Sequence, residues 1–588
     1  MSTLHVYSCT LVLLFSVLAR ADYPVTASWF AKRNSLSEWN TALDQFKAIG
    51  GDTVLQVGAS YNNRTKTSIS QDEAFANCKV NGVLCTDYTE QELNKKGLKI
   101  VSWVTYENNE IYGPKMLACP LDRNIVVKSP GVTYYRIVLH TTAVGDSEAC
   151  VFEPGTNVSV VFTSSASSDP QNLLLQSASS KAMSVYFGLP RLPPDLKSNP
   201  AGYQVVLSYL TWVYRVLADH SDRYGPHYQK TLTGYSGGYI NVLTDLTKGL
   251  KGSATGQSGL TIDDIAEIYK QVAIMVRNSG KKFLTAPSID LTKARGDALE
   301  DYADGVTGLA NVGIDVIALQ EGRGLGRSSY HEVNETTVQI KDGDQMLFQI
   351  LKKHNPLLPD TVTFGDIYTN NTQSLFKFLA SARANNQIQT ELWLVIQAFD
   401  DLGGDCTVDV DFTGSGIPAK VSPVDKSRVD WAIAAGGVSV QKIAAIAWDS
   451  LFTCTNQGSS LAQQISDDNE RPILSYCNFH SNWNQSVVVI GFNLLAETQG
   501  FQLYYLDYND NPQQSMIHGY YYETDYGVQH HLVPSLQYIM LWDFLPLNQM
   551  KRHGFLYVIP LGANHGCVFE YTIYYRRIFK LRGYSRHD

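Results

Sequence analysis

An alternation of short apolar segments with amphipathic stretches constrains the fold of this chain more than any other feature. An apolar strand pattern at residues 25–30 precedes a segment with Trp39, Leu43 and Phe46 at helical spacing, and a second apolar strand pattern follows at 53–57. Two such strands joined by a crossover helix pair in parallel, with the helix outside the sheet. This start predicts a parallel sheet covered by helices.

The same pattern returns in the middle of the chain. Helical spacing is found at 204–218, 262–277, 343–353, 374–384 and 429–435. Further strands are expected at 184–188, 237–242, 283–287, 315–320, 392–397 and 443–448. Together with the first two they make eight, the number in a closed (β/α)8 TIM barrel. The predicted fold class is α/β, with the barrel formed by residues 22–60 and 184–470.

Two regions depart from this pattern. Residues 61–183 contain four cysteines and β-leaning runs, and are expected to form a β-rich insertion after the second strand, over the C-terminal face of the barrel. From 471 to 588, short strands rich in Val, Ile, Phe and Tyr replace the helical patterns. They are expected at 486–492, 500–506, 555–560 and 568–574. This region is predicted to be a β-sandwich-like domain.

The first 21 residues have the pattern of a signal peptide. An apolar run at 10–18 precedes Ala19-Arg20-Ala21, a small-residue cleavage pattern. The run is far shorter than the roughly 20 residues that span a bilayer, and no later segment is long and apolar enough to do so. The chain is therefore expected to be secreted and extracellular, without a membrane span.

Eight cysteines remain once Cys9 is removed with the signal peptide. They are Cys78, Cys85, Cys119, Cys150, Cys406, Cys454, Cys477 and Cys567. An even number in an exported chain favours disulfides, and no pair has the C-x-x-C spacing of a zinc ribbon or a redox site. The pairing is open, with Cys78 to Cys85 and Cys406 to Cys454 favoured because each closes a local loop.

Five Asn-x-Ser/Thr sequons indicate a glycoprotein. They lie at Asn63, Asn157, Asn334, Asn370 and Asn484. The formal charge is −9, or −10 without Arg20, and the sequence contains no stripe of Lys and Arg residues. Both features argue against nucleic acid as a partner. No pattern predicts a cofactor or a metal, because the pair His530-His531 has no further ligand at helical spacing. The oligomeric state is left open.

Several runs in the barrel region resemble a known family. The runs are 39–43, 186–190, 238–240, 313–322 and 391–393, and Ala318-Leu319-Gln320-Glu321-Gly322 is the most specific of them. They are similar to a glycoside-hydrolase-like TIM-barrel family catalogued as a domain of unknown function, of the 4434 type. The resemblance covers roughly 25–60 and 184–450, and implies a sugar-binding cleft at the C-terminal barrel face. It also implies carboxylates at the ends of the fourth, sixth and seventh strands. Glu321 matches the sixth, whereas Leu243 and Gln397 stand where the other two are expected.

Hydrolysis of a glycosidic bond needs two carboxyl groups, one to protonate the leaving oxygen and one to attack or to activate water. Glu321 is the first candidate, because it ends an apolar strand and opens a glycine-rich loop. Asp245 and Asp449 are the candidate partners, since both follow expected strands. Each of these two is also explained by helix capping, in which the carboxylate accepts from free backbone N–H groups.

Amide and aromatic side chains near the same strand ends suit ligand binding. Gln320 and Gln397 can orient hydroxyl groups but cannot transfer protons at neutral pH. Trp29, Tyr239 and Trp448 could present ring faces to sugars, or pack in the core. Two functions follow: a secreted glycoside hydrolase acting on polysaccharide or glycoconjugate glycans, or an inactive barrel that binds carbohydrate or another extracellular partner.

Overall fold

A computed structural model describes most of the chain. It covers residues 23–123, 125–142, 150–191, 202–237, 262–289, 298–322, 338–343, 345, 348–349, 352, 360–361, 363–400, 408–410, 419–456, 458–480, 486–494, 500–517, 521–523, 525–541, 550, 553–563 and 567–572. Within these residues, no helix combines the length and the apolarity needed to cross a membrane.

Eight parallel strands close into a barrel, as the sequence predicts. In chain order they are β1 (Val25–Phe30), β2 (Thr53–Gln56), β10 (Ser184–Gly188), β11 (Leu232–Ser236), β12 (Lys282–Thr285), β13 (Val316–Gln320), β14 (Glu391–Ile396) and β18 (Lys442–Ala445). Each pairs with its neighbours in the order of the chain, and β1 closes the ring against β18. This order defines a (β/α)8 barrel.

A helix follows each barrel strand. The helices are α1 (Leu36–Ala48), α5 (Pro170–Ser180), α6 (Gly202–Arg223), α9 (Ile262–Asn278), α10 (Ala298–Asn311), α13 (Phe364–Asn385), α14 (Lys426–Gly436) and α16 (Leu461–Asp467). The first begins at Ser35, whose hydroxyl accepts from the Glu38 N–H while the Glu38 carboxylate accepts from the Ser35 N–H. Trp39, Leu43 and Phe46 face the barrel wall, fully buried.

The fourth strand lies five residues earlier than the sequence pattern indicates. It spans Leu232–Ser236, whereas 237–242 was the expected range. The interior of β11 contains Gly234, which lowers strand propensity and hides the strand from a pattern search. The structure explains this glycine, since a Cβ atom there would lie 2.5 Å from the Tyr186 ring and 2.4 Å from the Lys282 carbonyl oxygen.

The insertion forms a five-stranded sheet at the flank of the barrel. Its strands, in spatial order, are β3 (Tyr61–Arg64), β6 (Lys99–Asn109), β9 (Asn157–Ala166), β8 (Val132–His140) and β7 (Val126–Ser129). Short elements precede and join them: α2 (Lys66–Ser70), β4 (Lys79–Val80), β5 (Val83–Leu84), α3 (Cys85–Lys95) and α4 (Pro120–Arg123). One face of the sheet packs towards α3, and the other packs on α6.

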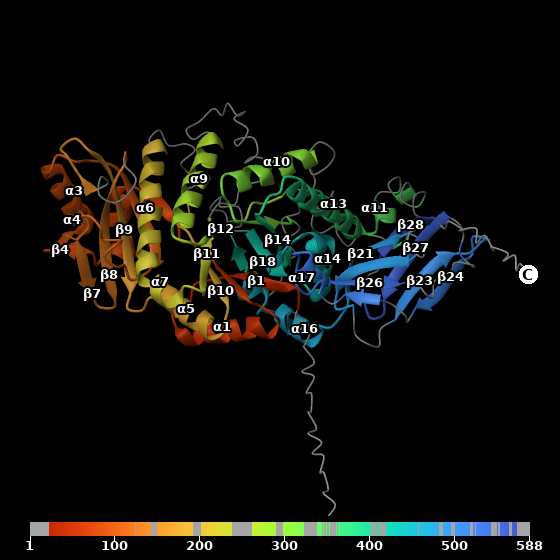
Figure 1. Ribbon diagram of the computed structural model, residues 1–588. Helices are drawn as coiled ribbons and strands as arrows, with labels where there is room; N and C mark the ends of the chain where they lie inside the picture. The colour runs from red at the N-terminus through yellow and green to blue at the C-terminus, as the bar shows by residue number, and fades with distance from the viewer. Residues whose placement is uncertain are drawn as a thin grey trace, which may run out of the picture.

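The expected place of the insertion over the barrel mouth stays a prediction. Its main contacts are with α6, the helix after β10, and Figure 1 shows the sheet beside that helix. Trp212 of α6 is fully buried and meets the rings of Tyr61, Tyr106 and Tyr112 from the insertion at 5.1–6.3 Å between centroids. Helix α6 is therefore shared by the barrel and the insertion.

Two four-stranded antiparallel sheets follow the barrel, at the end opposite the insertion (Figure 1). One contains β21 (Ile473–His480), β22 (Ser486–Phe492), β26 (Gln537–Leu541) and β25 (Tyr521–Glu523); the other contains β24 (Pro512–Ile517), β23 (Phe501–Leu506), β27 (His553–Pro560) and β28 (Cys567–Thr572). Apolar residues of both sheets form one core that includes Val487, Leu503 and Leu556. The first sheet also packs against α14 of the barrel.

Disulfides are present, as expected. Cys78 pairs with Cys85, which confirms the predicted local loop, and Cys119 pairs with Cys150. Cys454 and Cys477 are also disulfide-bonded. Cys406 lies outside the described residues, so its pairing with Cys454 stays a prediction, and the side chain of Cys567 is not described.

The five sequons fall in different surroundings. Asn63 on β3 and Asn157 at the start of β9 are both partly exposed. Asn370 lies within α13, and Asn334 and Asn484 lie outside the described residues. Glycosylation of all five stays a prediction.

Candidate functional site at the barrel mouth

The alternation of side chains along each strand decides which residues reach the barrel interior. On β13, Val316 and Ala318 belong to the interior cluster, whereas Ile317 and Leu319 belong to the core between strands and helices. Because successive side chains point to opposite faces, Gln320 points inward and Glu321 points outward. Gln320 and Glu321, neighbours at the end of the strand, therefore lie on opposite sides of the barrel wall.

Two glutamines meet inside the barrel at the C-terminal ends of β13 and β14. The Gln320 side-chain amide donates to the Ala286 carbonyl oxygen at 2.8 Å. The Gln397 amide donates to the Gln320 side-chain oxygen at 3.5 Å. Both are almost fully buried, with exposed fractions of 2% and 3%. Amides thus occupy the interior positions where the family resemblance implies at least one carboxylate.

Glu321 lies outside the barrel wall. Its side chain is fully buried and lines a cavity of about 10 Å³ together with Arg428 and Val429 of α14. Its carboxylate accepts from the Gln397 backbone N–H at 3.2 Å. The candidate acid is therefore placed between a strand and a helix, away from the interior where the two glutamines meet.

Asp449 connects two loops at the top of the barrel. It opens the short helix α15 (Trp448–Leu451) after β18, and its carboxylate accepts from the Ala31 backbone N–H at 2.7 Å. The same carboxylate forms an ion pair with Arg33. Both partners follow β1. Through this hydrogen bond and this ion pair, Asp449 connects the loop after the first strand to the segment after the eighth.

The two tryptophan candidates that the structure describes, Trp29 and Trp448, also lie on different sides of the barrel wall. Trp29 belongs to the interior cluster and is partly exposed. Trp448 is fully buried and stacks between Phe30 and Phe452, at 5.8 and 5.1 Å between ring centroids. A ring covered on both faces cannot stack on a ligand, so the structure assigns Trp448 to the core instead of to a sugar subsite.

Two further candidates, Asp245 and Tyr239, lie outside the described residues, as does Leu243. The described part of the chain ends after β11 at Gly237 and resumes at Ile262. The contribution of residues 238–261 to the mouth stays a prediction.

A buried ionic cluster joins the insertion to the barrel, and sequence reasoning missed it. Glu110, just after β6, pairs with His220 of α6 at 2.8 Å and with Arg223 at 3.3 Å. Arg223 also pairs with Asp169, the N-cap of α5, at 2.6 Å. These residues are scattered over more than 100 positions, so no motif could have revealed the cluster.

The cluster shifts the protonation of its members. Burial raises the pKa of Glu110, but the charges of His220 and Arg223 outweigh it, and the net pKa is lowered. Burial lowers the pKa of Lys32, after β1, to about 8, although Glu110 and Asp169 act in the opposite direction. The cluster thus brings together charged side chains from the end of β6, from α6 and from the start of α5.

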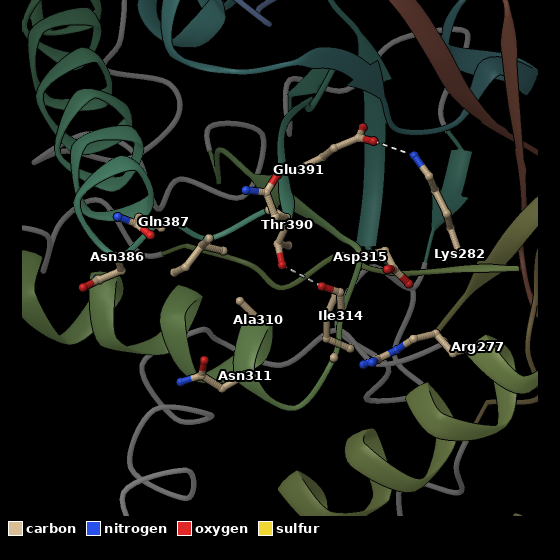
Figure 2. A pocket seen from close by; sticks show the side chains of 13 residues that line it. Arg277, Lys282, Ala310, Asn311, Ile314, Asp315, Asn386, Gln387, Thr390 and Glu391 are labelled. Carbon is tan, nitrogen blue, oxygen red and sulfur yellow. Dashed lines mark hydrogen bonds and ion pairs between the residues drawn. The ribbon is translucent and has the colours of Figure 1, made fainter.

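A polar groove lies at the opposite end of the barrel. It has a volume of about 380 Å³ and is lined by the segments that precede β12, β13 and β14. Figure 2 shows the Lys282–Glu391 ion pair, 2.6 Å long, and the bond from the Thr390 hydroxyl to the Ile314 carbonyl oxygen, 2.8 Å long. Active sites of TIM barrels lie at the C-terminal face, so we assign no function to this groove.

Among the described side chains, no group of three or more His, Cys, Asp and Glu is arranged to hold a metal ion.

One family model matches part of the chain. It is described as "Domain of unknown function (DUF8405)" and matches residues 64–165. This segment is most of the insertion and less than half of the chain, so it does not assign the chain to a family. The resemblance in the barrel rests on other residues, and its 4434 type stays a prediction. No curated protein matches this sequence.

Solved structures with a similar arrangement include proteins named as sugar-cleaving enzymes. A β-galactosidase from the psychrophilic Marinomonas ef1 has 11% identity and a TM-score of 0.32, with 76% of this chain and 59% of that chain covered. A xylanase from Cellvibrio japonicus has 10% identity and a TM-score of 0.27, with 51% and 81% covered. An intracellular xylanase from Thermoanaerobacterium saccharolyticum has 12% identity and a TM-score of 0.26, with 47% and 69% covered. The barrel is established by the strand order of this chain.

Proposed function

We propose that this protein is secreted and binds a carbohydrate chain at the barrel mouth without cleaving it. The observation that carries the proposal is the inward-facing pair Gln320 and Gln397, with Glu321 turned towards α14. Amides donate and accept hydrogen bonds, so they suit the hydroxyl groups of a sugar, but they do not transfer protons at neutral pH.

An aromatic ring on the interior side of the barrel supports the same proposal. Trp29, the last residue but one of β1, packs against the interior cluster and keeps part of its surface exposed. Sugar rings have apolar faces that pack on aromatic rings, while their hydroxyl groups seek polar partners. Trp29 with Gln320 and Gln397 supplies both kinds of contact.

Hydrolysis of polysaccharide or glycoconjugate glycans is the second candidate. It requires two carboxyl groups roughly 5–9.5 Å apart across the scissile bond. Two observations weigh against this candidate: Glu321 faces α14, and Asp449 forms an ion pair with Arg33. A hydrolytic pair would have to include residues outside the described part, of which Asp245 is the predicted one.

The test combines binding with product analysis. The purified protein is screened for binding to a panel of glycans and polysaccharides, and the same mixtures are analysed for released sugars by mass spectrometry. Gln397→Met removes the amide at nearly constant volume and should weaken binding about tenfold, the effect of losing one hydrogen bond. Trp29→Ala should weaken it at least as much.

Glu321→Gln is the matched control. It changes a carboxylate that faces α14 and keeps its shape, so ligand affinity should stay unchanged. Binding without sugar release supports the proposal. Release that Asp245→Asn abolishes would establish the hydrolase instead, and the absence of both binding and release would remove the mouth as a carbohydrate site.

A further inference from the structure

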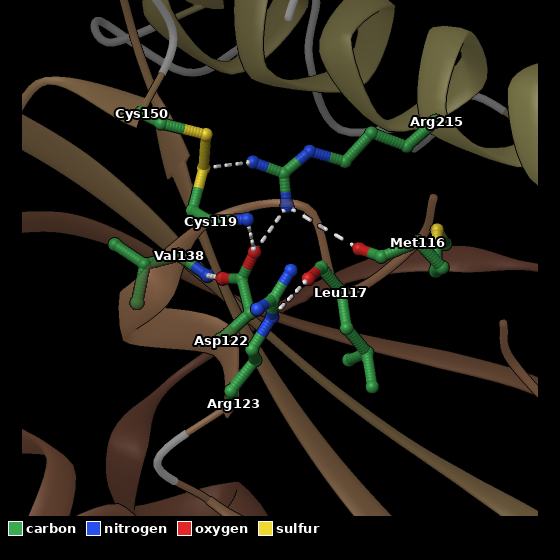
Figure 3. The surroundings of a disulfide bond; sticks show 8 residues. All are labelled: Met116, Leu117, Cys119, Asp122, Arg123, Val138, Cys150 and Arg215. Atoms are coloured by element: carbon green, nitrogen blue, oxygen red, sulfur yellow. Dashed lines mark hydrogen bonds and ion pairs between the residues drawn. A yellow bond between two sulfur atoms is a disulfide. The ribbon is translucent and has the colours of Figure 1, made fainter. Parts of the chain in front are cut away.

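The disulfide between Cys119 and Cys150 has a cationic neighbour on α6 of the barrel. Figure 3 shows the Arg215 guanidinium reaching across from α6 to this disulfide. One guanidinium nitrogen, Nη2, donates to Cys119 Sγ at 2.8 Å. The other, Nη1, donates to an Asp122 carboxylate oxygen at 2.7 Å and to the Met116 carbonyl oxygen at 3.5 Å.

The two sulfurs differ in their surroundings. Cys119 is fully buried, whereas Cys150 is partly exposed. Asp122 holds the Cys119 segment in place, because its carboxylate accepts from the Cys119 and Val138 backbone N–H groups at 3.0 and 2.8 Å. Cys150 is therefore the more exposed cysteine of the pair, and the guanidinium is fixed beside Cys119.

The rate of thiol–disulfide exchange depends on which sulfur is attacked and on how stable the leaving thiolate is. A nearby guanidinium stabilises a thiolate by its positive charge and by its N–H donors. In addition, burial raises the pKa of Asp122 despite Arg215, so this carboxylate takes up a proton more readily than an exposed aspartate would.

We propose that Cys119–Cys150 is a thiol–disulfide exchange site, with Cys150 as the attacked sulfur and Cys119 as the leaving thiolate held by Arg215. A thiolate of a small or protein thiol forms a bond to Cys150 Sγ, the Cys150–Cys119 bond breaks, and its electron pair remains on Cys119. A second thiolate then attacks the mixed disulfide and releases Cys150, so that two external thiols are oxidised to a disulfide and the protein disulfide is reduced to two cysteines. Because Arg215 belongs to α6, the exchange acts on the contact between the insertion and the barrel.

The experiment treats the folded, oxidised full chain with glutathione and quenches samples with an alkylating reagent over time. Mass spectrometry of the peptides gives the rate for each disulfide and the position of the glutathione adduct. We expect Cys119–Cys150 to react before Cys78–Cys85, and the adduct to form on Cys150. In the described contacts of the Cys78–Cys85 loop, no guanidinium or ammonium donates to a sulfur, and both cysteines are only 2% exposed.

A double variant, Arg215→Gln with Asp122→Asn, isolates the charge. It replaces both partners of the ion pair by amides of similar size, so neither charge is left buried alone. Exchange at Cys119–Cys150 should slow about tenfold, because the leaving thiolate loses the cation beside it. The rate at Cys78–Cys85 should stay the same.

Three results would overturn the proposal: an adduct on Cys119, faster reaction at Cys78–Cys85, or an unchanged rate in the double variant. The position of the adduct is measured on the unaltered protein, so the test stands even if the double variant does not fold.

Discussion

A single residue decides whether a carboxylate at the end of β13 reaches the barrel interior. Glu321 follows Gln320 directly, yet one faces α14 and the other faces Gln397. The sequence predicts the strand but not this orientation, because Val316 to Leu319 are all apolar and both faces of the strand are buried. Only the packing of the neighbouring strands shows which residues point inward.

The buried pair of Glu110 and His220 leads to a prediction at this scale. Glu110→Gln should cost about 3–5 kcal/mol at neutral pH, because it removes the buried carboxylate that pairs with His220 and Arg223. The carboxylate has a lowered pKa in the folded protein, so its stabilisation is complete above its ordinary pKa of 4.5 and is lost as the pH falls through the folded value. In urea unfolding, the difference in stability between the two proteins should therefore shrink as the pH falls below 4.5.

Glu90→Gln provides the control for this prediction. Glu90 pairs with Lys66 at 2.6 Å, but its side chain is 43% exposed, so the loss should stay below about 1 kcal/mol. An equal loss for the two variants, or a pH-independent loss for Glu110→Gln, would contradict the assignment.

At the scale of elements, the strands with continuous apolar runs are the ones that the sequence locates well. β1, β2 and β10 agree with their expected ranges to within one residue, as do β22 and β23 of the terminal sheets. Elements without a clear pattern are harder to locate: α10 contains Gly305 and Gly308, and α5 is rich in serine. Tertiary packing holds these helices in place, against their weak intrinsic propensity.

The fourth barrel strand gives the prediction for this scale. Gly234→Ala places a methyl group against the Tyr186 ring and the Lys282 carbonyl oxygen, so it should cost about 1–3 kcal/mol through overpacking. Gly225→Ala is the matched control, since the nearest atom to its new Cβ is the Ser221 hydroxyl at 3.9 Å. Urea unfolding of both variants measures the difference, and equal stabilities would show that Gly234 is not needed for packing.

At the scale of the whole molecule, the insertion, the barrel and the terminal sheets lie in a row and share contacts (Figure 1). The sequence predicts the three regions, but it does not show that α6 packs against both the barrel and the insertion. Tyr209, Trp212 and Val213 belong to one continuous core with residues of the insertion sheet. A helix that is apolar on opposite sides is buried on both, and its second partner cannot be identified from periodicity alone.

Removal of residues 64–165 tests this arrangement. The deletion would expose the face of α6 that contains Trp212, an apolar surface that promotes aggregation. We expect the shortened chain to elute as aggregates in size-exclusion chromatography and to lack a cooperative unfolding transition. A monodisperse product that unfolds cooperatively would show that the barrel does not depend on the insertion.

Closure of the barrel must also wait until most of the chain has been synthesised. The Ser28 hydroxyl of β1 donates to the Ala445 carbonyl oxygen of β18, across 417 residues of chain. A ribosome that adds about 5–20 residues per second needs roughly 20–80 s to make that stretch. During this interval β1 has β2 as a neighbour on one side and an open edge on the other, and such an edge can pair with a second nascent chain. Synthesis of this protein therefore includes a waiting period in which its first strand must be kept from the wrong partner.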